Sequence, residues 1–199
     1  AQGLMNMFQR DLIGAVAGVA FPAWARVHRE GGAVEPKWVV AVGAVTVFGW
    51  PFYGFLALMP LEIVRLMFGS QWDTAAALVP IFCAAGAVLA VSNLVLMQLI
   101  AVGRMDVVSR FELTFQPLRA GAIIAVAVTS ESLVACAWVF LVTAGLQALL
   151  TYVVKSRCVV FDWPALGTQL RASFQVTVLT VTIQLRVLCL QSARKVKSM

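Results

Sequence analysis

One cation lies well inside an apolar stretch of the sequence, and two polar residues share its helical face. Glu112, Gln116 and Arg119 follow the spacing i, i+4 and i+7, which places them on one side of a helix. A charge within a bilayer is costly and usually faces the interior of a helix bundle or a water-filled cavity. A guanidinium group there can bind two phosphate oxygens at once. The alternative is that Arg119 extends its long side chain back to the lipid headgroups.

Two further polar residues, Asn93 and Gln98, lie in a long stretch without charge. They are candidates for the polar lining of a binding cavity. Because positions five residues apart point to different faces of a helix, the spacing favours hydrogen bonds between neighbouring helices instead.

Residue types that carry covalent or metal chemistry are scarce. His28 is the only histidine, so the chain offers neither a His-based triad nor a multi-histidine metal site. The cysteines show no CxxC spacing and no redox role is inferred; they are Cys83, Cys136, Cys158 and Cys189. The sequence therefore predicts no catalytic residue, no metal site and no cofactor, and it indicates that the protein is not an enzyme.

Composition indicates that lipid is the solvent for most of these residues. Hydrophobic residues make up 61% of the chain, charged residues 12%, and the mean hydropathy is +0.91. Soluble domains are about 45–50% apolar and about 25% charged. The net charge of +6 resides in short loops between apolar segments, which favours contact with membrane lipids and argues against nucleic-acid binding.

The uncharged stretches predict membrane-spanning helices. A helix needs about 20 apolar residues to cross about 30 Å of hydrocarbon. The stretches 38–61, 74–103 and 132–154 meet this requirement, and the segments 3–25, 107–130 and 173–190 are weaker candidates because charges interrupt or border them. The last is rich in Val and Thr, but a single strand in lipid would leave its backbone unpaired, so a helix is expected there too. The prediction is an all-α, polytopic transmembrane bundle of about five or six spans.

Proline and glycine subdivide these segments. Pro51, in the middle of the first uncharged stretch, removes a backbone donor and should kink its helix, where it could act as a hinge or as a static bend. Pro60 and Gly69 enclose an apolar segment that suits a short surface or re-entrant helix. Gly14 and Gly18 form a GxxxG pair that could allow close helix packing.

Basic residues predict an orientation. The loops 26–37, 103–112 and 155–172 together hold eight Lys or Arg, whereas the loops 60–73 and 129–133 hold one. The positive-inside rule places the first three loops in the cytoplasm. Trp38, Trp72 and Trp163 lie near the ends of hydrophobic segments, which is typical of the aromatic belt at a membrane interface.

Three sequence patches resemble a known family. They are FPAWARVHREGG at 21–32, LMFGSQWDTAAALVPIF at 66–82 and AVGRMDVVSR at 101–110. Their order and spacing, over roughly residues 4–155, resemble the polysaccharide (O-antigen and exopolysaccharide) flippases of the multidrug/oligosaccharidyl-lipid/polysaccharide exporter superfamily. The resemblance implies half of a transporter of twelve to fourteen helices. Residues 1–160 would form its C-terminal-half bundle, and residues 161–199 would form a weakly matching last helix and a basic tail.

The resemblance also implies a function. Such proteins move undecaprenyl-diphosphate-linked saccharides across the bacterial inner membrane by alternating access, for surface polysaccharides such as lipopolysaccharide. The expected partners are the lipid-linked oligosaccharide, membrane lipids and the missing N-terminal half of the same protein. The alternatives are a membrane-embedded polysaccharide polymerase or glycosyltransferase, a drug/cation antiporter of the same superfamily, and a structural membrane subunit. The antiporter would be expected to carry an acidic residue inside a span, and the three clear stretches contain none.

Overall fold

The described chain is almost entirely helical. The computed structural model describes residues 14–159 and 162–197. The elements in chain order are α2 (Gly14–Arg29), α3 (Glu35–Leu58), α4 (Pro60–Phe68), the 3-10 helix η2 (Ser70–Leu78), α5 (Val79–Ala101), α6 (Met105–Ser130), α7 (Leu133–Cys158) and α8 (Trp163–Lys197). The predicted all-α fold is confirmed.

Local sequence signals set the helix ends. The Ser132 hydroxyl accepts a hydrogen bond from the Ala135 amide at 3.4 Å and caps the start of α7. The Asp162 carboxylate accepts one from the Ala165 amide at 3.1 Å at the start of α8. After α5 the chain turns at Gly103, whose φ of +79° is easily reached by glycine, and the Arg104 amide donates to the Leu99 carbonyl.

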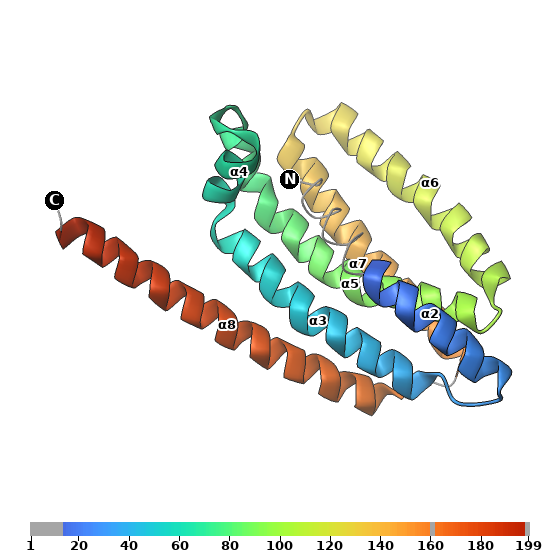
Figure 1. Cartoon of the computed structure of the whole chain (residues 1–199). Helices are drawn as coiled ribbons and strands as arrows, with labels where there is room; N and C mark the ends of the chain where they lie inside the picture. Colours follow the sequence, from blue (N-terminus) through green and yellow to red (C-terminus); the bar gives the residue numbers. More distant parts are fainter. Residues whose placement is uncertain (1–13, 160–161, 198–199) are drawn as a thin grey trace.

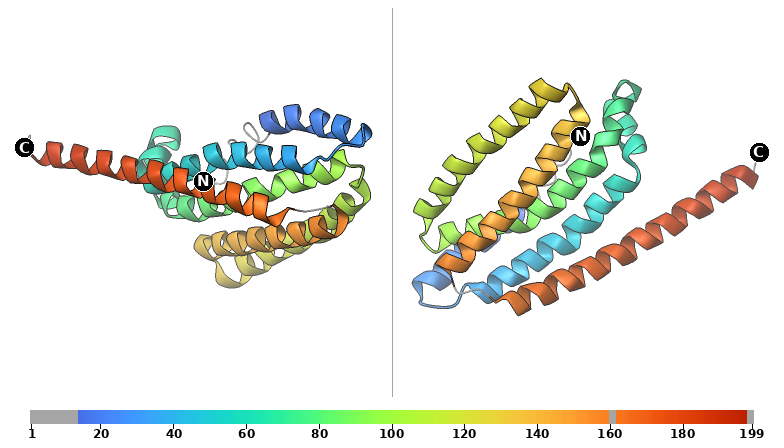
Figure 2. Two further views of the ribbon diagram at one scale, coloured as in Figure 1. Left: turned by 90° about the horizontal axis from the view of Figure 1, so that it is seen from below. Right: turned by 180° about the vertical axis from the view of Figure 1, so that it is seen from behind.

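The long helices form one curved row, and α2 lies against one face of it. The row runs α8, α3, α5, α7, α6, each helix packing against the next, and α2 packs against α3 and α5 (Figures 1 and 2). Long helices that follow one another along the chain run in opposite directions, whereas the neighbours α8 and α3, and likewise α5 and α7, run in the same direction. The three basic loops therefore lie at one end of the row, which we call the basic-loop end, and α4 and η2 lie at the opposite end.

Four segments are long and apolar enough to cross a membrane. They are Glu35–Leu58, Ser70–Ala101, Met105–Ser130 and Leu133–Cys158. They correspond to the three clear uncharged stretches and to the predicted segment 107–130. The segment 173–190 is helical, as expected, but the α8 helix that contains it is not among these four. Of the first predicted segment, residues 3–13 lie outside the described part, and the remainder lies in α2.

Small side chains allow α8 to lie close to α3. Above Gly43 the space that a side chain would need is taken by Gln169, and above Gly54 it is taken by Val181. Between them the hydroxyls of Thr46 and Ser173 form a buried hydrogen bond of 2.7 Å.

The GxxxG interpretation of Gly14 and Gly18 is not supported, because a methyl group added at either position would meet no described atom within 4 Å. The glycines that permit close packing are instead in α3.

The opposite end is organised by a connected pair of short helices. Arg65 of α4 donates from Nε and Nη2 to the two carboxylate oxygens of Asp73 in η2, at 2.9 and 2.6 Å. This hydrogen bonding, with the charge of Asp73, raises the pKa of Arg65 above its usual value. The predicted short helix between Pro60 and Gly69 is confirmed as α4.

Candidate functional site

Arg119 lies on the inner side of α6 and contacts α7. Its Nη1 donates to Oε1 of Gln147 at 3.0 Å, and its guanidinium carbon lies 4.2 Å from the centre of the Phe140 ring. Gln147 and Phe140 are both buried residues of α7. The side chain is therefore directed across the bundle toward α7, which favours the interior role predicted for this cation.

A pocket of about 450 Å³ surrounds this guanidinium. We call it the α6–α7 pocket; its walls are Leu78, Phe82, Gln116, Arg119, Ala120, Ile123, Leu133, Cys136 and Phe140. Most of these side chains are apolar. A pocket with apolar walls and one cation can hold a ligand that combines a hydrocarbon part with an anionic group.

Two of the three residues on the predicted polar face reach the α6–α7 pocket. Gln116 and Arg119 line it, whereas Glu112 lies one turn earlier and accepts a hydrogen bond from Gln116 Nε2 at 2.7 Å. The shared helical face is therefore confirmed. Glu112 contacts the pocket through Gln116 rather than directly.

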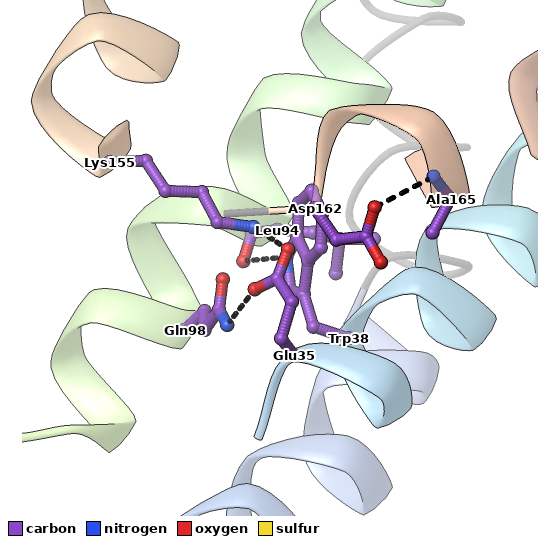
Figure 3. Close-up of polar contacts among 7 residues, drawn as sticks. All are labelled: Glu35, Trp38, Leu94, Gln98, Lys155, Asp162 and Ala165. Atoms are coloured by element: carbon purple, nitrogen blue, oxygen red, sulfur yellow. Dashed lines mark hydrogen bonds and ion pairs between the residues drawn. The ribbon is translucent and has the colours of Figure 1, made fainter. Parts of the chain in front are cut away.

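The basic-loop end contains a second polar group, the charge cluster of Glu35, Trp38, Gln98 and Lys155 (Figure 3). Lys155 Nζ donates to Glu35 Oε1 at 3.0 Å, and Gln98 Nε2 donates to Glu35 Oε2 at 2.9 Å. The Lys155 ammonium lies over the ring of Trp38, whose Nε1 donates to the Leu94 carbonyl at 3.1 Å. Lys155 is fully buried and the Glu35 side chain is 13% exposed.

Two residues of the charge cluster lie in helices and not in the predicted loops. Glu35 was placed in the loop 26–37 and Lys155 at the start of the loop 155–172, but α3 begins at Glu35 and α7 continues to Cys158. The uncharged stretch 38–61 itself contains no acidic residue, but the helix that holds it begins earlier, at Glu35. Lysine and glutamate both favour helices, and this propensity was the available signal that the two helices extend further.

Trp38 does not occupy the interfacial position predicted for it. It is completely buried between helices, because its ring packs under the Lys155 ammonium and its Nε1 donates to α5. Trp72 and Trp163 are 53% and 57% exposed near helix ends, as expected for an aromatic belt.

Gln98 and Asn93 differ in role. Gln98 joins α5 to α3 through Glu35, which confirms the prediction of a hydrogen bond between helices. Asn93 is half-buried on α5 and lines neither the α6–α7 pocket nor the pocket beside Glu35. Pro51 is half-buried within α3, and the neighbouring Trp50 donates from Nε1 to the Ala87 carbonyl of α5 at 3.1 Å.

A second pocket, of about 470 Å³, opens beside Glu35. It lies at the basic-loop end, between the ends of α2, α5 and α7, and is lined by His28, Gly32, Ala33, Val34, Glu35, Val102, Arg104, Cys158 and Val159. We call it the loop-end pocket. No group of three potential metal ligands occurs among the described residues.

The fold and these interior polar groups define a multi-pass helical membrane protein. Residues 1–77 match the family model described as polysaccharide biosynthesis protein. This match contains the first of the three sequence patches and most of the second, and it confirms the resemblance to polysaccharide flippases there. Over residues 1–77 the chain is thus similar to polysaccharide biosynthesis proteins, and its four apolar helices fit a membrane protein. No curated protein and no solved structure matches the chain.

Proposed function

We propose that this chain forms part of a flippase that moves undecaprenyl-diphosphate-linked saccharides across the bacterial inner membrane. Transport would proceed by alternating access together with the other half of the protein, and no covalent bond would be made or broken. The observation that carries this proposal is the position of Arg119, directed into the α6–α7 pocket by Gln147 and Phe140.

The chemistry of the α6–α7 pocket suits such a lipid. A guanidinium group has five N–H donors in a planar fork, so Arg119 can donate to Gln147 and still offer donors to phosphate oxygens. The apolar walls formed by Leu78, Phe82 and Ile123 can contact the isoprenoid chain. In this proposal the saccharide extends beyond the pocket, since its few polar side chains cannot satisfy many hydroxyl groups.

The test replaces Arg119 in the full-length protein and measures saccharide export at matched membrane levels. Arg119→Ala should reduce export by about tenfold or more, because hydrogen bonds to charged groups contribute about 1.5–3 kcal/mol. Arg119→Lys should impair export less, since it keeps the charge and loses the fork. Arg110→Ala removes an exposed cation of the same helix and serves as the control. Normal export by both Arg119 variants would leave this residue without a role in binding the cargo.

One alternative gains support from the charge cluster. A drug/cation antiporter of the same superfamily would use an acidic residue inside a span, and the largely buried Glu35 lies at the first residue of the span-length helix α3. Its two carboxylate oxygens, however, already accept from Lys155 and Gln98. The flippase is therefore the better proposal. Flipping of a fluorescent lipid-linked saccharide in proteoliposomes, compared with efflux of a cationic dye, distinguishes the two functions.

A further inference from the structure

Three helices meet in the charge cluster at the basic-loop end. Glu35 belongs to α3, Gln98 to α5 and Lys155 to α7. The α3 and α7 helices each pack against α5, and the ion pair connects them across it (Figure 3). From this geometry we propose that the Glu35–Lys155 pair is a clamp, which closes the bundle at the basic-loop end and releases when that end opens.

Because the ion pair of Glu35 and Lys155 is buried, separating the two charges costs free energy. Lys155 is fully buried, so its ammonium has lost its water shell and is compensated by Glu35 and by the Trp38 ring. Separation of α3 from α7 without rehydration would leave an uncompensated charge in the bundle. The closed arrangement is therefore favoured as long as water is excluded.

The loop-end pocket provides the route by which water can reach the pair. Glu35 lines this pocket and is the partly exposed member, whereas Lys155 lies behind it. Hydration of both charges becomes possible when the ends of α3 and α7 move apart, and this lowers the cost of separation. The clamp thus has two states, a dry paired state and a wet open state.

The Gln98 amide can hydrogen-bond with either an acidic or a basic side chain at position 35. Its Nε2 donates to Glu35, while its Oε1 is buried and has no hydrogen-bond partner among the residues that the structure describes. An amide can donate or accept on the same side after a half-turn. This property predicts that Gln98 tolerates an exchange of the two charges, because its oxygen can then accept from a lysine at position 35.

Two native cysteines report on the clamp. Cys158 lines the loop-end pocket, and Cys136 lines the α6–α7 pocket near the other end of the same helix. The experiment uses the full-length protein in liposomes, in two versions that keep one of these cysteines and replace the remaining native ones by Ser. The rate of labelling with a membrane-permeant maleimide measures how open each end is.

Glu35→Gln and Lys155→Met should each raise the labelling rate of Cys158 by about tenfold, because either change removes the ion pair that connects α3 to α7. The rate at Cys136 should change by less than about twofold, since the clamp acts at the other end. Glu30→Gln, which breaks the exposed ion pair between Arg26 and Glu30, is the matched control and should leave both rates unchanged.

The exchange E35K/K155E should return the Cys158 rate to the parent value. Folding of each variant is checked by size-exclusion chromatography. If the single variants do not fold, the exchange and the neutral double variant E35Q/K155M decide: the clamp requires parent-like labelling in the first and faster labelling in the second. Unchanged Cys158 labelling in folded Glu35→Gln and Lys155→Met, or an exchange that labels as fast as they do, would overturn the proposal. Labelling requires no cargo, so these outcomes are independent of the proposed flippase function.

Discussion

At the scale of single residues, Gln147 decides where the Arg119 side chain points. The residue is 4% exposed, and its Oε1 accepts from Arg119 Nη1. The Gln147 carbonyl also accepts from the Thr151 hydroxyl at 2.7 Å. Because Gln147 contacts Arg119 and does not line the α6–α7 pocket, it is a positioning residue for the proposed phosphate site.

Gln147→Leu should therefore weaken export without abolishing it. The loss should be about threefold to tenfold, less than for Arg119→Ala, because the guanidinium remains and loses one hydrogen bond. Gln147→Glu keeps an acceptor at the same place and should retain more activity. The measurement is transport of a lipid-linked saccharide over a range of concentrations. A merely structural role would lower the amount of folded protein and leave the apparent affinity unchanged.

Pro51 allows a second prediction at this scale. A proline inside a helix removes one backbone hydrogen bond and crowds the preceding turn. If this weak point lets α3 flex, Pro51→Ala should stiffen the helix and slow export severalfold, while thermal stability rises. Export rate and melting temperature measured on the same preparation separate the two interpretations: higher stability with unchanged export indicates a static bend.

The residues also show what sequence can and cannot reveal. Arg119, Gln116 and Glu112 were found because a charge in an apolar stretch and helical spacing are both visible in one segment. The pair of Glu35 and Lys155 joins two segments far apart in the chain, so it depends on helix packing that no local pattern contains. Each residue was adjacent to a basic loop and was therefore interpreted as part of it.

At the scale of helices, the close contact of α3 with α8 depends on glycine residues of α3. Gly54 faces Val181, whose Cγ2 would lie 2.8 Å from an added Cβ. Valine has few rotamers and cannot easily move aside. We therefore expect that one methyl group added at Gly54 would push α8 away from α3.

Gly54→Ala should lower the free energy of unfolding by about 1–3 kcal/mol, the usual cost of overpacking. Gly145→Ala is the control, because a methyl group at Gly145 in α7 meets nothing within 4 Å. Since alanine favours helices more than glycine does, the control should be neutral or stabilising. The melting temperature of the purified protein in detergent measures both. Equal shifts in the two variants would mean that α8 does not pack tightly against α3.

The sequence predicts where the spanning helices lie, but it does not predict which helices pack against each other. Uncharged stretches of sufficient length predicted α3, α5 and α7 because lipid permits few charges. In lipid, however, the side of a helix that faces a neighbour is as apolar as the side that faces hydrocarbon. The order of the row and the glycines used for packing therefore leave little trace in the hydrophobic pattern. Gly14 and Gly18 stand out in the sequence because of their GxxxG spacing, whereas no such spacing marks Gly43 and Gly54, which make the close contacts.

At the scale of the whole molecule, the helices form an open row rather than a closed bundle. The α6 helix shows this, because its buried residues are only Val108 and Phe115. Exposed apolar side chains also cover the outer side of α7, including Trp138, Val142 and Leu149. Lipid or another part of the full-length protein must cover these surfaces in a membrane. The apolar surfaces therefore place the row within the membrane. The basic loops indicate which end of the row faces the cytoplasm.

The last prediction concerns this orientation. The ends of α2, α5 and α7 bring the loops around Arg29, Arg104 and Arg157 to the basic-loop end, while α4 and η2 lie at the opposite end. Because basic residues are retained on the cytoplasmic side, the basic-loop end should face the cytoplasm, and residues 62–73 and residue 130 should face the periplasm.

Single cysteines at positions 29, 70, 104 and 157, introduced after replacement of the native ones, test this in intact cells with an impermeant maleimide. Position 70 should react from outside, and the other three should react only after permeabilisation. Ser70 is exposed at the start of η2, so protection there cannot be attributed to burial within the described fold. Labelling of position 29 from outside together with protection of position 70 would invert the orientation. The clamp formed by Glu35 and Lys155 would then close the periplasmic end, because it lies at the same end of the row as Arg29.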